Sequence, residues 1–273
     1  MTRRRWVMAM GAVGLALLAP LKAAAAPRWH TSPRASVLVV GGSMMNGDRF
    51  ADSVKAAMRR HYAGCERVAL VLHPSHPDER DRMEARLQKA FADLGVREAV
   101  SLHRRDEAGA AALLRQADAI FVGGGETFVL LAELHRTGQL ALIRERVLAG
   151  IPYGGSSAGA NVAGLVIGTT NDFPVTDVPS REALGLLPVS INPHHPLPAQ
   201  KADFDGRVGK IAAYLKFNPG ETVLALANAS ILRLHRGEAT LETGTGWLYT
   251  SRDRRELAVG DPVPGLGAGA EVR

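Results

Sequence analysis

The sequence predicts an α/β fold built on a mostly parallel sheet, and three features of the chain support this prediction. Apolar runs of strand length alternate with segments of helical periodicity from residue 36 to residue 148, the order expected of a parallel sheet with helices on both faces. The first run, residues 36–42, is continuously apolar, which is typical of a strand buried on both faces. It ends in glycines, as does the strand that runs into residues 123–125. Since binding sites form at the carboxyl ends of such strands, we expect a site at this edge.

The expected elements follow one another in a regular order along the chain. The strands of the first half are expected at residues 36–42, 67–72, 99–102 and 119–122, and the helices between and after them at 47–63, 78–94, 106–116 and 127–148. Gly138 is expected to break the last of these helices. The second half is expected to hold a loop at 169–180, a strand at 189–192, a helix at 203–217 and short strands at 223–227, 231–235, 239–243 and 247–249. We expect these short strands to form an antiparallel edge.

Length and charge narrow the class of protein. The 273 residues are enough for one large domain or two small ones, and 46% of them are apolar, so a sizeable core is available. The formal charge of +6 falls to +2 when Arg3, Arg4, Arg5 and Lys22 are left out. With few aromatic residues as well, the remaining chain offers no basic and aromatic surface for a nucleic acid.

Residues 1–26 are interpreted as an export signal. Arg3, Arg4 and Arg5 resemble a twin-arginine motif, and small residues at 23–26 suit cleavage. The uncharged apolar stretch 6–21 is short for a membrane span, which needs about 20 residues. We therefore expect periplasmic export and no stable membrane association once the signal is removed; the alternative is a retained N-terminal anchor. The single cysteine, Cys65, allows no intrachain disulfide, which is compatible with folding before transport.

The segment Gly155-Ser156-Ser157-Ala158-Gly159 fits the G-x-S-x-G nucleophile elbow. In this motif a serine stands on a sharp strand-to-helix turn, where side chains two positions away on either side would collide. The frame selects Ser157, because a turn centred on Ser156 would put Ala158 where the second glycine belongs. The helix that follows would present free backbone N–H groups to a developing oxyanion. The alternative is a loop rich in glycine and serine without chemistry.

Other polar residues near the strand ends suggest partners for this serine. The run Gly123-Gly124-Gly125 lacks the features of a P-loop and is better placed to give an oxyanion-hole N–H, although a simple tight turn is the alternative. His194 ends a strand and is our candidate for a general base, but the sequence does not decide between it and His195. Asp172 could orient such a base or be a solvated turn residue.

A metal site is not expected, because the proline-rich spacing of the remaining candidates matches no common site. These candidates are His73, His76, Asp78 and Glu79.

The motifs from Gly123 to His194 together resemble peptidase E, the α-aspartyl dipeptidase of the S51 serine peptidases. They are Gly-Gly-Gly-x-Thr-Phe, Ser-Ala-Gly-Ala-Asn, Thr-Thr-Asn-Asp-x-Pro and Ile-Asn-Pro-His, in this order. The separations between Gly125, Ser157, Asp172 and His194 match those of the family without gaps. The resemblance continues more weakly over residues 36–249 and does not cover the export signal.

This resemblance implies a single catalytic domain over residues 27–273, a three-layer sandwich related to the class I glutamine amidotransferases, and no metal or cofactor. It implies Ser157 as nucleophile and His194 as general base. Gly125 and Ala158 would offer oxyanion N–H groups. Asp172 matches an aspartate linked to catalysis in the family, and Arg207 matches an arginine that would pair with the aspartate of a substrate.

Three positions depart from the family pattern. Asn228 stands where the family has the glutamate of its catalytic triad, which puts activity in question. Glu126 replaces an asparagine and adds a negative charge next to the expected site, where it would contact substrate. Ser156 replaces a tryptophan. The last two changes put the preference for aspartate in question.

We therefore expect an exported serine exopeptidase that hydrolyses short peptides with an N-terminal aspartate. The oligomeric state is left open. One alternative is a cyanophycinase-like peptidase of the same superfamily, which would cut β-aspartyl-arginine. Another is a catalytically impaired member that acts as a binding protein, and a third is an α/β-hydrolase esterase, which shares the order Ser…Asp…His.

Overall fold

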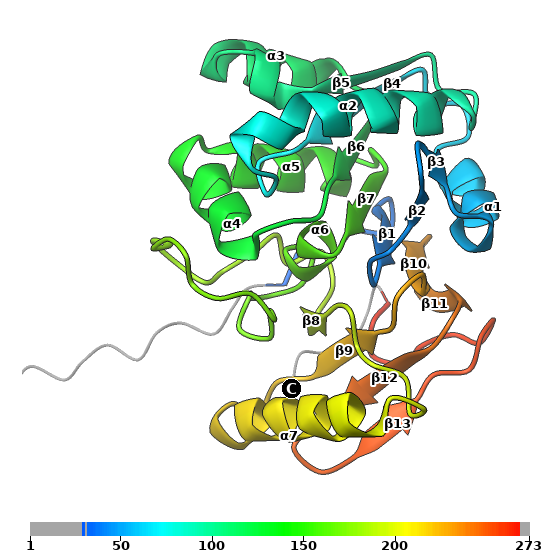
Figure 1. Ribbon diagram of the computed structural model, residues 1–273, viewed down its shortest axis with the longest axis vertical. Coiled ribbons are helices and arrows are strands. Elements are labelled where there is room, and N and C mark those ends of the chain that lie inside the picture. The colour runs from blue at the N-terminus through cyan, green and yellow to red at the C-terminus, as the bar shows by residue number, and fades with distance from the viewer. Residues whose placement is uncertain (1–28, 31, 268–273) are drawn as a thin grey trace, which may run out of the picture.

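The computed structural model describes residues 29–30 and 32–267, so the expected export signal lies outside the described residues. A seven-stranded sheet lies between two layers of helices, and a smaller sheet covered by one long helix lies below it in the view of Figure 1. The α/β architecture that the sequence predicts is therefore confirmed.

The seven-stranded sheet is mostly parallel. Its strands, in spatial order, are β11 (Glu238–Thr243), β10 (Ile231–His235), β1 (Ser36–Val40), β7 (Tyr153–Ser156), β6 (Ala119–Val122), β4 (Arg67–Val71) and β5 (Glu98–Ser101). Strands β1, β7, β6, β4 and β5 run parallel, and β10 and β11 add an antiparallel edge beside β1. The carboxyl ends of β1, β6 and β7 therefore meet at one edge of the sheet.

Helices cover both faces of this sheet because its central strands are apolar on both sides. In β1, Val37 and Val39 belong to one core cluster and Leu38 and Val40 to the other. The first cluster is covered by α3 (Glu107–Gln116), α4 (Thr127–Arg136), α5 (Gln139–Leu148) and α6 (Ala158–Asn161), the second by α1 (Asp52–His61) and α2 (Pro77–Ala92). A short 3₁₀ turn, η1 (Leu102–Arg104), follows β5.

The C-terminal strands differ from the expectation of a single antiparallel edge. Only β10 and β11 extend the large sheet, whereas a second sheet has the order β13 (Arg254–Glu256), β12 (Gly246–Tyr249), β9 (Val223–Leu226) and β8 (Ser190–Asn192). The reason is that β9 and β12 turn apolar side chains toward α7 (Lys201–Phe217) and build a third core cluster with it. This cluster includes Phe204, Leu215, Val223 and Trp247.

Two local expectations have different outcomes. The helix expected from residue 47 begins only at Asp52, because a hairpin of β2 (Met45–Asn46) and β3 (Arg49–Phe50) precedes it and Gly47 turns with a φ of 62°. The break at Gly138 is confirmed: α4 and α5 are separate helices, and Gly138 between them has a φ of 69°. No helix within the described ranges is long and apolar enough to span a membrane.

Candidate active site

Ser157 stands on a sharp turn between strand β7 and helix α6. Its backbone has a φ of 54° and a ψ of −111°, a conformation that a residue with a β-carbon adopts only where its surroundings enforce it. The N–H of Ser157 donates to the carbonyl of Val40 at the end of β1 (3.1 Å), which fixes the turn to the neighbouring strand. The side chain is half-buried.

The two glycines that flank Ser157 are required by the packing of this turn. A β-carbon on Gly155 would lie 2.3 Å from the carbonyl oxygen of Gly159, and one on Gly159 would lie 2.2 Å from the carbonyl oxygen of Val122. Both contacts are with backbone, which cannot move aside as a flexible side chain does. The local geometry of an elbow is therefore present, with Ser157 rather than Ser156 at its tip, since Ser156 is the last residue of β7 and is buried.

His194 connects Ser157 to Asn228. The Nε2 atom of His194 lies 2.7 Å from Oγ of Ser157, and its Nδ1 atom lies 2.6 Å from Oδ1 of Asn228. An amide oxygen only accepts hydrogen bonds, so Nδ1–H of His194 donates to Asn228, and Nε2 is then free to accept from the serine hydroxyl. This is the tautomer that a general base needs.

The loops that carry His194 and Asn228 are held by glycines at the end of β1, which the sequence did not single out for this task. The N–H of His194 donates to the carbonyl of Gly41 (2.7 Å), and the N–H of Ala229 donates to the carbonyl of Gly42 (2.8 Å). A β-carbon on Gly41 would lie 2.1 Å from the carbonyl oxygen of Ala227, and Gly42 has a φ of 118°. The only signal in the sequence was the pair of glycines after an apolar strand.

The run of three glycines after β6 lies beside Ser157. A β-carbon on Gly124 would approach Cβ of Ser157 to 3.0 Å, and Gly125 has a φ of 134° with no room for a side chain against the carbonyl of Pro74. In the described part of the chain, the N–H groups of Gly125 and Ala158 donate no hydrogen bond. They are therefore available to an oxygen of a substrate.

Asp172 forms no hydrogen bond with His194 within the described residues, contrary to the expectation that it would orient the base. Its Oδ2 accepts a hydrogen bond from the N–H of Thr127 (2.8 Å), the first residue of α4. The acceptor on Nδ1 of His194 is instead the amide of Asn228. The physical reason is placement: the loop that carries Asp172 docks on the start of α4, whereas Asn228 follows β9 and lies at Nδ1 of His194.

Arg207 projects from α7 toward the peptide that carries His194. Its Nη1 donates to Oδ1 of Asn192 (3.0 Å) and to the carbonyls of Pro193 and His194 (both 3.3 Å). Its hydrogen bonds to the described residues all come from Nη1, and none of its ion-pair distances to a described carboxylate is within 4 Å. The guanidinium is half-buried, and burial lowers the pKa of Arg207 from its usual value.

The structure separates the roles of the two neighbouring histidines, which the sequence could not do. His194 is exposed, but His195 is buried, with Nδ1 against the carbonyl of Pro196 (2.8 Å) and Nε2 against the hydroxyl of Tyr249 (2.9 Å). Its ring also packs on Trp247. Burial lowers the pKa of His195 to about 4, with smaller contributions from Arg207 and Arg254, so this ring is neutral at pH 7.

Glu126 directly follows Gly125 and is exposed at the start of α4. Its N–H donates to the carbonyl of Pro74 (2.8 Å), but its carboxylate forms no ion pair with another described residue. The site thus offers the carboxylate of Glu126, which has no ion pair to a described residue, beside the glycine loop (residues 123–125), and the guanidinium of Arg207 beside the histidine loop (residues 193–195).

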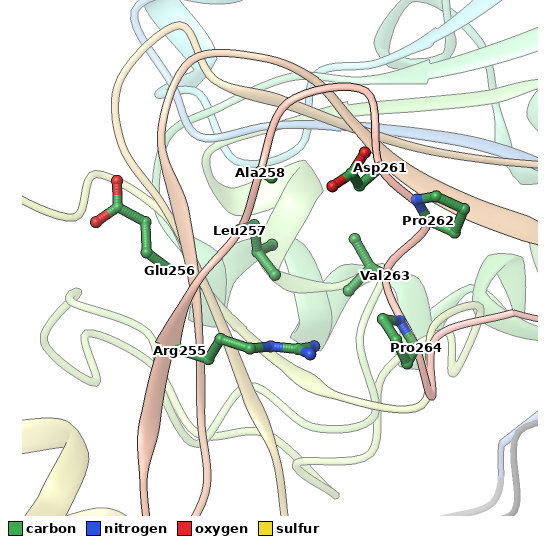
Figure 2. Close-up of a pocket in the computed structure, with 8 residues that line it drawn as sticks. All are labelled: Arg255, Glu256, Leu257, Ala258, Asp261, Pro262, Val263 and Pro264. Atoms are coloured by element: carbon green, nitrogen blue, oxygen red, sulfur yellow. The ribbon is translucent and has the colours of Figure 1, made fainter.

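Two other features of the surface lie apart from these residues. A hollow of about 230 Å³ is lined by residues of β13 and the segment after it, among them Arg255, Leu257 and Val263, and none of its lining residues belongs to the site (Figure 2). In the described ranges, the group with the spacing of a metal site is Asp81, Glu84 and His103. The guanidinium of Arg104 pairs with both of these carboxylates and takes the place a cation would occupy.

Known proteins resemble this chain in sequence and in fold. The sequence model of peptidase family S51 matches residues 37–242. Peptidase E of Pasteurella multocida is 41% identical over 174 residues, which are 63% of this chain and 73% of the relative. Peptidase E of Streptomyces coelicolor is 34% identical over 235 residues, 85% of this chain and 94% of the relative. The crystal structure of a peptidase from an acI-B1 Actinobacterium shares the fold with a TM-score of 0.65 at 16% identity, over 84% of this chain and 96% of that one.

Proposed function

This chain belongs to peptidase family S51 and is a serine peptidase, and from that premise we propose that it is an exported exopeptidase that removes aspartate from the N-terminus of short peptides. The observation that carries the proposal is the line of hydrogen bonds from Ser157 through His194 to Asn228. A base with the correct tautomer, in contact with a serine on an elbow, is an arrangement for acyl transfer.

In the proposed reaction Oγ of Ser157 attacks the carbonyl carbon of the first peptide bond, and its proton passes to Nε2 of His194. The N–H groups of Gly125 and Ala158 receive the negative charge that develops on the carbonyl oxygen. His194 then donates the proton to the leaving amine, which departs and leaves an acyl-enzyme. Water, deprotonated by the same imidazole, releases the amino acid and restores the serine.

Preference for aspartate is proposed on the charge of Arg207. A substrate carboxylate that enters a half-buried site needs a cation, because an unpaired charge is costly to desolvate. Arg207 lies beside the backbone of His194, and its guanidinium has further N–H donors besides Nη1, which holds the histidine loop. Glu126, which directly follows Gly125 and is exposed, is proposed to face the cationic part of the substrate.

The test is an assay of the purified chain on a library of dipeptides. We expect Asp-X dipeptides to be cleaved with a higher kcat/KM than Ala-X or Leu-X dipeptides. Cleavage of β-aspartyl-arginine in preference to Asp-X would instead favour a cyanophycinase-like peptidase. Turnover of p-nitrophenyl esters without any peptide would favour an esterase.

A catalytically impaired member of the family that acts as a binding protein is the second candidate, and one observation favours it. The acceptor on His194 is the neutral amide of Asn228, which orients the ring but adds no negative charge to stabilise the imidazolium. A fluorophosphonate probe separates the two candidates: labelling that is lost in Ser157→Ala supports the enzyme, and no labelling supports the binding protein.

Export is proposed on the sequence of residues 1–26. Replacement of Arg3, Arg4 and Arg5 together by lysine should block transport by a twin-arginine route and leave the protein in the cytoplasm. The unaltered protein should be recovered from the periplasm with a new N-terminus. Recovery from the cytoplasm with residues 1–26 still attached would contradict this.

A further inference from the structure

The segment Thr169–Asp172 lies between the two loops that meet at Ser157 and is bonded to both. On one side, Oδ2 of Asp172 accepts from the N–H of Thr127 (2.8 Å), and Oγ1 of Thr170 donates to Oγ1 of Thr127 (3.0 Å). On the other side, Nδ2 of Asn171 donates to the carbonyl of Pro193 (2.8 Å), the residue before His194.

The contact with Thr127 acts on the glycine loop. Thr127 is buried and is separated from Gly125 by a single residue, Glu126. The N–H of Glu126 is held by Pro74, so the backbone after Gly125 is fixed at two successive N–H groups. Loss of the bond to Thr127 would remove one of these two holds, and we infer that the N–H of Gly125 would then be less firmly placed.

The contact with Pro193 is part of a polar network beneath the histidine loop. Oδ1 of Asn171 also accepts from Nδ2 of Asn192 (2.9 Å), and Oδ1 of Asn192 accepts from Arg207 (3.0 Å). The backbone carbonyls of Pro193 and His194 are thus held by hydrogen bonds from Asn171 and Arg207, respectively.

We propose that Asp172 is a positioning residue, which holds the N–H of Gly125 in place through Thr127. Its neighbour Asn171 holds the carbonyl of Pro193, so that His194 and the N–H of Gly125 keep their places beside Ser157. The inference rests on the proposed function of this site. It assigns Asp172 a task different from that of a triad carboxylate, since Asp172 forms no hydrogen bond with His194 or Ser157 in the described structure.

The two tasks differ in what they require of the side chain. A carboxylate that stabilises an imidazolium needs its negative charge, so asparagine would be nearly as damaging as alanine. An acceptor for the N–H of Thr127 needs only an oxygen at that position, and asparagine provides one. The start of a helix also favours a negative charge, so asparagine should be somewhat weaker than aspartate.

The first test compares kcat and KM of Asp172→Ala and Asp172→Asn on one Asp-X dipeptide. A displacement of about 1 Å in a catalytic group costs on the order of 10²-fold in rate. We expect Asp172→Ala to lose about that much in kcat with little change in KM, and Asp172→Asn to recover most of it. Asp177→Ala is the matched control, because Asp177 is an exposed aspartate of the same loop, and it should keep kcat close to that of the unaltered protein.

The second test measures hydrogen exchange at the N–H of Thr127 and needs no turnover. Protection should fall in Asp172→Ala and persist in Asp172→Asn and in Asp177→Ala. If the unaltered protein cleaved no peptide, the proposed function would fail, and exchange at Thr127 would still decide whether Asp172 holds this loop. Equal loss of kcat in both Asp172 variants, or unchanged protection of Thr127 in Asp172→Ala, would overturn the inference.

Discussion

The imidazole of His194 lies against the bare α-carbon of Gly42, so closely that a β-carbon on Gly42 would be 2.0 Å from Cε1 of the ring. No real β-carbon approaches an atom that closely, so one of the two would have to move. His194 has a φ of 53° and is tied through its N–H to Gly41, which leaves the ring little freedom to yield. The absence of a side chain at Gly42 is therefore part of what sets the contact between His194 and Ser157.

Gly42→Ala should accordingly lower kcat strongly. We expect a loss on the order of 10²-fold, because the imidazole must leave the position in which it bonds Ser157. Gly42 also has a positive φ, which strains any substitution, so a control must carry the same strain. Gly95→Ala is suitable: Gly95 has a φ of 96° and open space at the position of a β-carbon.

Both variants should fall in melting temperature, Gly42→Ala by more because its β-carbon also collides with His194, but only Gly42→Ala should lose kcat. Steady-state kinetics on an Asp-X dipeptide and thermal unfolding give both values. Equal kcat in the two variants would mean that the contact with His194 does not matter for catalysis.

The second prediction concerns the nucleophile. Ser157→Ala should lower kcat by a factor on the order of 10⁶, the cost of removing the nucleophile from such a unit. Ser156→Ala is the matched control, because Ser156 precedes it and ends strand β7 without taking part in the line to His194. It should change kcat by only a few-fold. Near-normal kcat in Ser157→Ala would show that the elbow does not carry the reaction.

A part of this site could be predicted from the sequence where the residues that determine it lie close together in the chain. The elbow could be predicted because its motif lies within five residues, from Gly155 to Gly159, although the backbone that a side chain on Gly159 would meet belongs to Val122. The partner of Asp172 could not be predicted. Its contact with Thr127 depends on how a loop after α6 packs on the start of α4, and no spacing in the sequence reports this.

The fold shows the same division. The alternation of apolar runs and helical segments was enough to predict the parallel sheet, because buried strands and helices differ in their pattern of apolar residues. The second sheet was missed because β9 and β12 are as apolar as the strands of the first, and which sheet they join is decided by packing against α7. Gly42 was visible only as a glycine after a strand, since His194, the residue it accommodates, lies far along the chain.

The third prediction concerns Arg207 and substrate preference. A hydrogen bond to a charged group contributes about 1.5–3 kcal/mol, or roughly 10- to 100-fold. Arg207→Ala should lower kcat/KM for Asp-X dipeptides by about that factor more than for Ala-X dipeptides. Ala-X should also lose some activity, because Nη1 of Arg207 supports the carbonyl of His194.

Lys210→Ala, an exposed cation on the same helix, is the control and should leave the ratio between the two substrates unchanged. Equal losses on both substrates in Arg207→Ala would restrict this residue to the support of the histidine loop.

The fourth prediction concerns stability at acid pH. Burial lowers the pKa of His195 to about 4 and that of His61 to about 3, both below the usual value of 6.5. The unfolded chain therefore binds protons at these histidines as the pH falls below 6.5, while the folded chain does not. Between pH 7 and pH 5 each histidine should lower the free energy of unfolding by about 2 kcal/mol.

Urea unfolding at pH 7 and pH 5 measures this difference, and in this range most carboxylates stay ionised. His195→Gln, which can still donate to Pro196 and accept from Tyr249, should reduce the difference between the two pH values even if it lowers stability at both. The same difference in the variant as in the unaltered protein would show that His195 does not titrate in this way.

Asn228 is the acceptor that holds the tautomer of His194, and catalysis should depend on it. The most direct test is kcat on one Asp-X dipeptide for the unaltered protein, Asn228→Ala and Asn228→Asp. Aspartate is isosteric with asparagine and adds a charge beside an exposed imidazole, where such a pair contributes about 1 kcal/mol. We predict that Asn228→Asp raises kcat by roughly five- to tenfold and that Asn228→Ala lowers it; if both variants kept the kcat of the unaltered protein, Asn228 would not be the residue that orients the base.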